Sequence, residues 1–157
     1  MQKITPFLWF DNQAEEAMRF YTSVFKNSKT GKVTYYGEGA PLPKGTVMTA
    51  SFELEGMQFT ALNGGPLFKF TEAVSFHISC KNQEEVDYYW EKLTAGGGQV
   101  VQCGWLKDKY GLSWQVVPAV LYELLGDKDR AKAQRVTQAM LAMKKLDIKK
   151  LQEAALE

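Results

Sequence analysis

Apolar and polar residues alternate in two short segments, one at the start of the chain and one near its middle. In residues 4–10, Ile4, Pro6, Leu8 and Phe10 share one face, and Thr5, Phe7 and Trp9 share the other. In residues 74–80, Val74, Phe76, Ile78 and Cys80 share one face, and Ser75, His77 and Ser79 share the other. A period of two predicts strands. We expect Ile4, Leu8, Phe76 and Ile78 to lie against helices and the opposite faces to border a cavity.

Each of these strands is followed by apolar residues at helical spacing. In the first half, Ala17, Phe20, Tyr21 and Val24 form such a stripe, and Val86, Tyr89, Trp90 and Leu93 form its counterpart in the second half. Such stripes predict helices with one buried face. Asn12 and Glu15 are expected to cap the first helix. Strand candidates then follow at residues 32–36, 47–54 and 57–62, with a loop rich in glycine and proline at 37–45.

Residues 102–118 predict a strand, a tight turn and a last strand. The turn at 107–111 is polar and contains Gly111, and the apolar run 112–117 ends at Pro118. Each half of the chain therefore has a strand, a helix and further strands. The sequence predicts an α+β fold of two βαβββ units, 1–70 and 71–118, in one domain spanning 1–157. A single unit cannot bury its own apolar faces, so the two are expected to pair around a cavity.

Residues 119–157 predict a helical tail. A short helix at 119–125 ends at Gly126, and a longer helix capped by Asp127 is expected through about residue 145. Asp147 is expected to cap a last helical turn. We expect the tail to pack on its own sheet or on a neighbouring subunit, because methionine and other apolar residues in a stripe usually form packing surface.

Composition narrows the classes of function. The chain has 157 residues, 45% apolar and 24% charged, and a formal net charge of +1. This balance predicts a globular protein without a basic surface for nucleic acid or membrane. A small-molecule ligand or a protein partner is therefore expected. The beginning of the chain lacks the apolar core of a signal peptide, so a cytoplasmic protein is expected. Cys80 and Cys103 are too far apart for a CxxC motif and are expected to be reduced.

The motif CGWLKDKYGLSWQVVP at residues 103–118 has companions on either side. It is preceded by NQEEVDYYW at 82–90 and followed by MLAMKKL at 140–146. Together these motifs resemble the PhnB-like branch of the glyoxalase/bleomycin-resistance/dioxygenase superfamily, also called the vicinal oxygen chelate superfamily. Members of this branch are often labelled 3-demethylubiquinone 3-methyltransferase. The resemblance implies paired βαβββ units around a cavity, helices on the outer faces, and a homodimer.

The resemblance also indicates where a metal would bind. Metal-dependent members of the superfamily use His and Glu ligands on the first and last strands of each unit, and the matching positions here are near Thr5, Asn63, Ser75 and Gln115. Asn63 and Gln115 match through their spacing to Pro66 and Pro118. Hydroxyls and neutral amides are poor ligands for zinc and add no charge to hold a hard cation. We therefore predict no cofactor; a divalent metal would suit the fold but is not supported by these residues.

Two functions remain open. The first is a metal-independent protein that binds a small molecule in the cavity, as bleomycin-resistance relatives do. The second is an enzyme of the superfamily, metal-assisted or using His77 as a general base or Cys103 as a nucleophile. For either function the candidate pocket residues are Thr5, Phe7, Trp9, Asn63, Ser75, His77, Cys103, Trp105 and Gln115.

Methyltransferase activity is not expected from the sequence. A typical adenosylmethionine-binding domain has a glycine-rich loop between its first strand and the following helix. Here the first strand continues into FDNQA at residues 10–14, which contains no glycine, and the glycines at 96–98 follow a helix. The label attached to the PhnB-like branch is therefore not taken as an activity.

Overall fold

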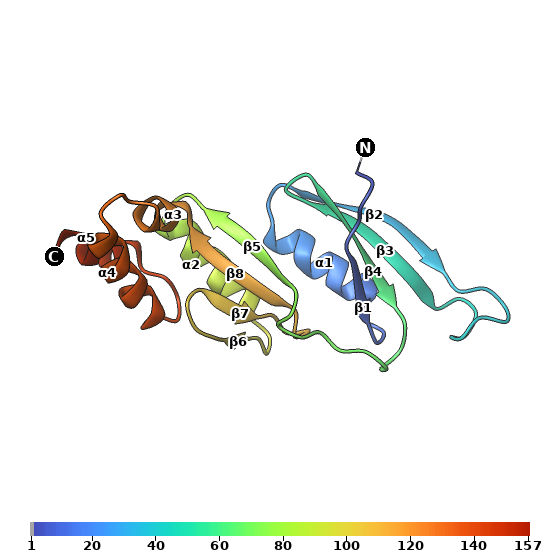
Figure 1. The fold of residues 1–157 in the computed structure, drawn as a ribbon. Coiled ribbons are helices and arrows are strands. Elements are labelled where there is room, and N and C mark those ends of the chain that lie inside the picture. Colours follow the sequence, from blue (N-terminus) through green and yellow to red (C-terminus); the bar gives the residue numbers. More distant parts are fainter. Residues whose placement is uncertain (1) are drawn as a thin grey trace. The chain divides into compact units, whose positions relative to one another are not determined.

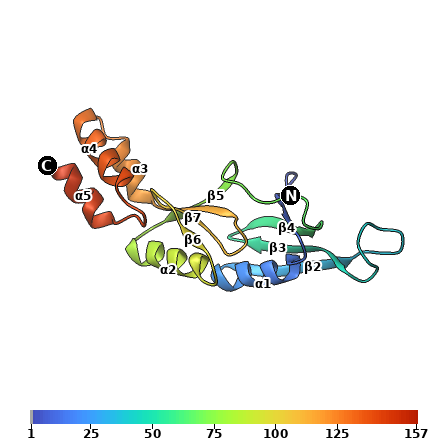
Figure 2. The same ribbon diagram turned by 90° about the horizontal axis from the view of Figure 1, so that it is seen from below.

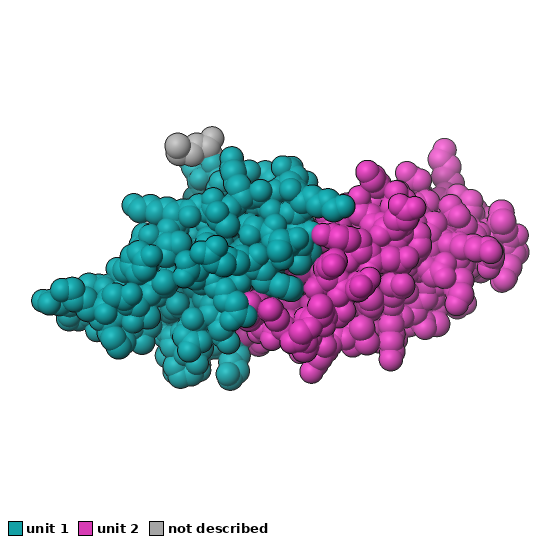
Figure 3. Space-filling model, turned by 180° about the vertical axis from the view of Figure 1, so that it is seen from behind, with its two compact units in different colours: residues 1–69 teal, residues 70–157 magenta. Residues whose placement is uncertain are grey.

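The computed structural model describes residues 2–157, which form two compact units. The first unit ends at Lys69 and the second begins at Phe70 (Figures 1 and 3). Each unit contains one four-stranded sheet with parallel and antiparallel pairs. The tail belongs to the second unit. None of the helices within residues 2–157 has the length and apolar character needed to cross a bilayer.

The first unit has the predicted strand and helix order. Its elements are β1 (Phe7–Phe10), α1 (Ala14–Val24), β2 (Ser28–Tyr35), β3 (Val47–Leu54) and β4 (Met57–Asn63). The sheet order is β1-β4-β3-β2, with β1 parallel to β4 and the other pairs antiparallel. Tyr21 of α1 stacks on Phe52, and Phe52 stacks on Phe59. The apolar stripe of α1 thus packs on one face of this sheet.

The second unit repeats this arrangement. Its elements are β5 (Ser75–Cys80), α2 (Gln83–Thr94), β6 (Gln99–Val100), β7 (Trp105–Lys107) and β8 (Ser113–Pro118), and its sheet order is β5-β8-β7-β6. Again the opening and closing strands are parallel. Figure 2 shows α1 and α2 each running along one face of its own sheet. The predicted α+β fold with two βαβββ units is therefore observed.

Two local expectations in the first unit are wrong. β1 begins at Phe7, and Ile4 is 85% exposed, so Ile4 does not pack on a helix. The residue that precedes α1 is Gln13, whose side chain makes no capping hydrogen bond, and Asn12 is not the cap. Instead the Ala14 N–H donates to Asn63 Oδ1 at 2.8 Å. A side chain from β4 therefore takes the place of the expected local cap.

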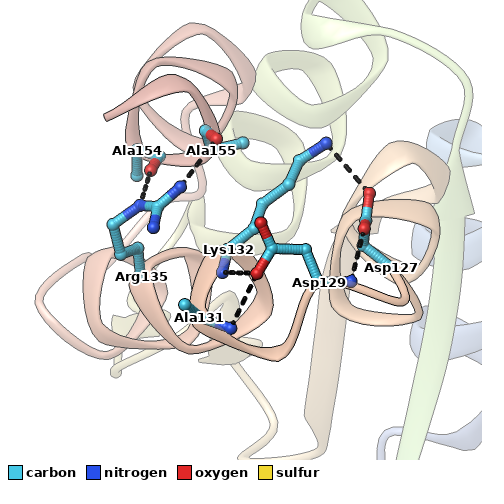
Figure 4. Close-up of polar contacts among 7 residues, drawn as sticks. All are labelled: Asp127, Asp129, Ala131, Lys132, Arg135, Ala154 and Ala155. Carbon is cyan, nitrogen blue, oxygen red and sulfur yellow. Dashed lines mark hydrogen bonds and ion pairs between the residues drawn. The ribbon is translucent and has the colours of Figure 1, made fainter.

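The tail forms α3 (Ala119–Leu125), α4 (Arg130–Leu141) and α5 (Ile148–Leu156). Asp129, rather than Asp127, caps α4, because its Oδ1 accepts the backbone N–H groups of Ala131 and Lys132 (Figure 4). Asp127 instead pairs with the Lys132 side chain at 2.9 Å. Asp147 caps α5 as predicted, accepting the Lys150 N–H.

The tail packs on the unit to which it belongs. Its buried core consists of Val117 from β8 together with Leu121, Val136, Leu146, Leu151 and Ala155. Gln83 of α2 joins this core to the helix of the βαβββ unit, since its Nε2 donates to the Leu146 carbonyl and its Oε1 accepts the Ile148 N–H. Arg135 donates to the Ala154 and Ala155 carbonyls and so ties α4 to α5 (Figure 4).

Candidate functional site

One face of the second sheet is turned away from α2; we call it the far face. The opposite face carries Leu106 and Val116, both fully buried. It also carries Cys80, whose thiol has its pKa raised to about 12 by burial and by the nearby Glu85 carboxylate of α2. Side chains alternate along a strand, so the residues next in sequence to these point to the far face. It consists of Ser75, His77, Ser79, Trp105, Lys107, Ser113, Gln115 and Val117.

The centre of the far face is a row across neighbouring strands. His77 pairs with Gln115, and Gln115 pairs with Trp105. Paired residues in a sheet point to the same side and lie close together. Gln115 Nε2 donates to Ser75 Oγ at 2.9 Å. An imidazole, a carboxamide and an indole therefore lie side by side, with a serine hydroxyl holding the carboxamide.

One end of the far face carries a charged and a polar side chain, Lys107 of β7 and Ser113 of β8. Lys107 forms an ion pair with Glu72, and the hydrogen bond from Lys107 holds the pKa of the Glu72 carboxyl below its usual value. Ser113, next to Lys107 in the register, is only 1% exposed, and its Oγ has no hydrogen-bond partner within residues 2–157. The formal charges at this end of the far face compensate each other.

His77 has a partner that sequence reasoning missed. Its Nε2 lies 2.8 Å from the Tyr122 hydroxyl, and the two ring centroids are 5.6 Å apart. Tyr122 lies on α3, at a sequence separation of 45 residues. No periodic pattern connects a helix of the tail with the opening strand of the unit, so the sequence contained no signal for this contact.

Asp108 is a second residue that was missed. It is 2% exposed, and its Oδ1 accepts the N–H groups of Tyr110 and Leu112 while its Oδ2 accepts Trp114 Nε1–H. These bonds fix the turn between β7 and β8 and therefore the register that aligns Trp105 with Gln115. An aspartate that opens a turn containing Gly111 is a recognisable signal for such a side-chain-capped turn.

Asn63 does not occupy the position predicted for it. The β1–β4 register pairs Phe7 with Thr60, whereas the β5–β8 register pairs His77 with Gln115. Phe7 and His77 are the middle residues of the matching faces of the two opening strands. Thr60 is therefore the counterpart of Gln115, and the expected equivalence of Asn63 and Gln115 is wrong. Asn63 lies an odd number of residues further along β4, which turns its side chain to the α1 side. There it is 3% exposed and bonds to Ala14 N–H and the Val47 carbonyl.

The first sheet has a corresponding face turned away from α1. Phe7 is 60% exposed on it, and Trp9 donates its Nε1–H to the Gly65 carbonyl at 2.9 Å. The ring of Phe68 packs edge-on against the ring of Trp9, with 4.9 Å between the ring centroids. Gly64 is needed beside this ring, since a Cβ there would lie 2.3 Å from Trp9 Cζ2. Thr5 lies just before β1 and is partly buried.

Cys103 lies in the loop between β6 and β7, two residues before Trp105. Its φ of 58° is unusual for a residue with a side chain, and its N–H donates to the Met143 carbonyl at 2.8 Å. The following Gly104 N–H donates to the Lys144 carbonyl. None of the hydrogen bonds or ion pairs within residues 2–157 joins the Cys103 thiol to His77 or Lys107. Its role as a nucleophile stays a prediction.

The donor groups do not fit the metal site of the superfamily. Ser75 and Gln115 are hydrogen-bonded to each other. In the first unit the residue that corresponds to Gln115 is Thr60, which offers a hydroxyl. Hydroxyls and a carboxamide supply neither charge nor a preferred ligand for a borderline metal. Within residues 2–157 no group of three or more His, Cys, Asp or Glu side chains is arranged to hold a metal.

A hollow of about 510 Å³ lies elsewhere in the second unit, where α2 and α5 begin. It is lined by Lys81, Asn82, Gln83, Val120, Asp147, Ile148, Lys149 and Gln152. None of the predicted pocket residues borders it. Asn82 and Asp147 cap the two helices, so Asn82 Oδ1 and Asp147 Oδ1 each already accept a backbone N–H.

Comparison with known proteins identifies the family. A family model described as 3-demethylubiquinone-9 3-methyltransferase matches residues 2–117. A putative 3-demethylubiquinone-9 3-methyltransferase, PhnB protein, from Bacillus cereus is 40% identical, with a TM-score of 0.68, over 75% of this chain and 100% of that chain. No curated protein matches the chain.

More distant solved structures share the fold. Protein PA1353 from Pseudomonas aeruginosa is 19% identical, with a TM-score of 0.61, over 75% of this chain and 98% of that chain. The fosfomycin resistance protein FosX from Listeria monocytogenes is 18% identical, with a TM-score of 0.56, over 80% of this chain and 98% of that chain. The chain therefore belongs to the 3-demethylubiquinone-9 3-methyltransferase-like (PhnB) family and has the fold of the vicinal oxygen chelate superfamily.

Proposed function

We propose that this PhnB-family protein binds a neutral small molecule on the far face of its second sheet, without a bound metal. The main support is the row of His77, Gln115 and Trp105 across β5, β8 and β7. Binding sites are mostly apolar and aromatic, with a few polar groups that fix the orientation of the ligand. An indole, a carboxamide and an imidazole in one row supply both kinds of contact.

The chemistry of the row favours a class of ligand. Gln115 uses one amide N–H for Ser75, and a carboxamide has a second N–H and an acceptor oxygen to offer. Trp105 and His77 lie on either side of Gln115, so their rings are two strand spacings apart, roughly 10 Å. A flat ligand with a carbonyl or hydroxyl group fits between such rings and above the amide. The row favours a neutral, partly aromatic compound over an anion.

The second candidate function is an enzyme that uses His77 in proton transfer. One observation favours it, the 2.8 Å contact between His77 Nε2 and the Tyr122 hydroxyl, because such a pair can hold or pass a proton. The hydroxyl and carboxamide groups at the expected ligand positions are poor metal donors. The turn from β1 to α1 runs through Asp11, Asn12 and Gln13 and contains no glycine for binding the methyl donor. The central cavity and the homodimer implied by the resemblance stay predictions.

A thermal-shift screen with neutral metabolites, followed by affinity measurements, tests the proposal. His77→Ala should weaken each hit by about 2- to 13-fold, the effect of one lost neutral hydrogen bond of about 0.5–1.5 kcal/mol. The melting temperature without ligand should stay within a few degrees, because His77 is exposed. Ser79→Ala, on the same strand but paired with Val117 outside the row, is the matched control and should leave affinity unchanged.

The opposite result would remove His77 from the site: a lower melting temperature with unchanged affinity for every hit. Metal content of the protein purified without a tag tests the metal-independent part of the proposal. A stoichiometric divalent ion would contradict metal-independent binding and would favour the metal-assisted enzyme.

A further inference from the structure

The tail begins where the family match ends. The family model covers residues 2–117, and α3 follows directly from the end of β8. From this helix Tyr122 reaches back to β5, where its hydroxyl lies 2.8 Å from His77 Nε2. The two rings are inclined at 45° to each other. A segment outside the matched region thus contacts the row on the far face.

The position of Tyr122 is set by packed elements. Leu121, its neighbour on α3, is buried with Val136 and Leu151 in the core of the tail. The Gly126 N–H donates to the Tyr122 carbonyl and ends the helix. The following turn is tied to α4 by the ion pair between Asp127 and Lys132 (Figure 4). Tyr122 therefore projects from a helix whose ends and buried face are fixed.

We propose that Tyr122 is a positioning residue that fixes the tautomer of His77 for ligand binding. A neutral imidazole has one N–H and one acceptor nitrogen, and the partner of one nitrogen decides which of them carries the proton. A phenol O–H donates readily, so Tyr122 donates to Nε2 and keeps the proton of His77 on Nδ1. The Nδ1–H then serves as a donor for a ligand carbonyl. The part concerning the ligand rests on the proposed function.

The assignment gives the tail a role in specificity. With the proton on Nδ1, His77 offers a donor, and compounds with a carbonyl oxygen are preferred over compounds with only donor groups. With the proton on Nε2, Nδ1 would be an acceptor, and compounds with donor groups would be preferred instead. The tail, rather than the βαβββ unit itself, would thus decide which hydrogen-bonding pattern the site accepts.

Nitrogen NMR of the imidazole tests this directly, because the chain contains a single histidine. At a pH at which the ring is neutral, the wild-type protein should show the Nδ1–H form in excess. Tyr122→Phe keeps the ring that packs on His77 but removes the hydroxyl, and should shift the ring toward the Nε2–H form. Tyr88→Phe, on α2, is the matched control and should leave the signals as in wild type. Equal tautomer populations in wild type and Tyr122→Phe would overturn the proposal.

A second measurement separates this inference from the proposed function. Benzamide, a neutral flat carbonyl compound, should shift the His77 nitrogen signals, and Tyr122→Phe should bind it a few-fold more weakly. If the tautomer changes in Tyr122→Phe but benzamide moves no signal in either protein, Tyr122 still positions His77 and the ligand part fails. If the tautomer is unaffected by Tyr122→Phe, the positioning role fails whatever benzamide does.

Discussion

At the scale of residues, Asn63 illustrates how strand register decides what a side chain does. Its spacing to Pro66 resembles that of Gln115 to Pro118, yet the parallel partner β1 pairs Asn63 with Phe10 and sets it on the α1 side. A shift by an odd number of residues moves a side chain to the opposite face of a sheet. Sequence spacing alone contains no information on that pairing, so this pocket residue could not be assigned correctly.

The role of Asn63 as a cap leads to a stability prediction. Asn63→Ala should destabilise the protein by about 1–3 kcal/mol, because a buried Ala14 N–H and the Val47 carbonyl both lose a partner. Gln13→Ala is the control and should change stability by less than about 0.5 kcal/mol, since Gln13 makes no side-chain capping bond. Chemical denaturation measures both. Equal effects for the two variants would contradict the assignment.

Alternation predicted the buried face of the first strand in part. Leu8 and Phe10 are buried, as the period of two requires. Ile4 is exposed, because the backbone hydrogen bonds between the first strand and β4 begin only at Pro6, whose carbonyl accepts the Thr60 N–H. Alternation predicts a face only where a strand has a partner to pair with.

At the scale of elements, periodicity predicted the strand–helix–strand order of both units. Each helix has one apolar stripe that packs on one face of its sheet, and this packing requires the periodic pattern. The end of α4 shows what periodicity misses. The pattern predicted a helix through about residue 145, but α4 ends at Leu141. The carbonyls of Met143 and Lys144 accept the N–H groups of Cys103 and Gly104 instead, so a tertiary contact ends the helix.

The junction between the tail and α2 depends on Gln83. Gln83→Ala removes both bonds that join this residue to Leu146 and Ile148. Amide exchange at residues 146–151 should become about tenfold faster, equal to a loss of about 1.4 kcal/mol in local stability. Exchange in α1, which belongs to the other unit, should not change. Gln152→Ala, an exposed position on α5, is the control. Unchanged exchange in Gln83→Ala would mean that the tail is held without this side chain.

At the scale of the whole molecule, the fold followed from the duplicated pattern and from the resemblance carried by residues 103–118. That no metal binds stays a prediction, and the correction from Asn63 to Thr60 replaces one neutral side chain with another at the expected ligand position. The contribution of the tail could not be expected. Tyr122 reaches His77 through the packing of α3 on β8, and such a contact leaves no period in the sequence.

The row of His77, Gln115 and Trp105 is the proposed binding site for a neutral small molecule. The most direct measurement is nitrogen-edited NMR of the metal-free protein, titrated with the hits of the neutral-metabolite screen. We expect the shifts to concentrate on the Gln115 side-chain amide, the Trp105 indole N–H and the His77 ring. Shifts concentrated on Asn82, Lys149 and the other residues that line the hollow where α2 and α5 begin, with the row unaffected, would contradict it.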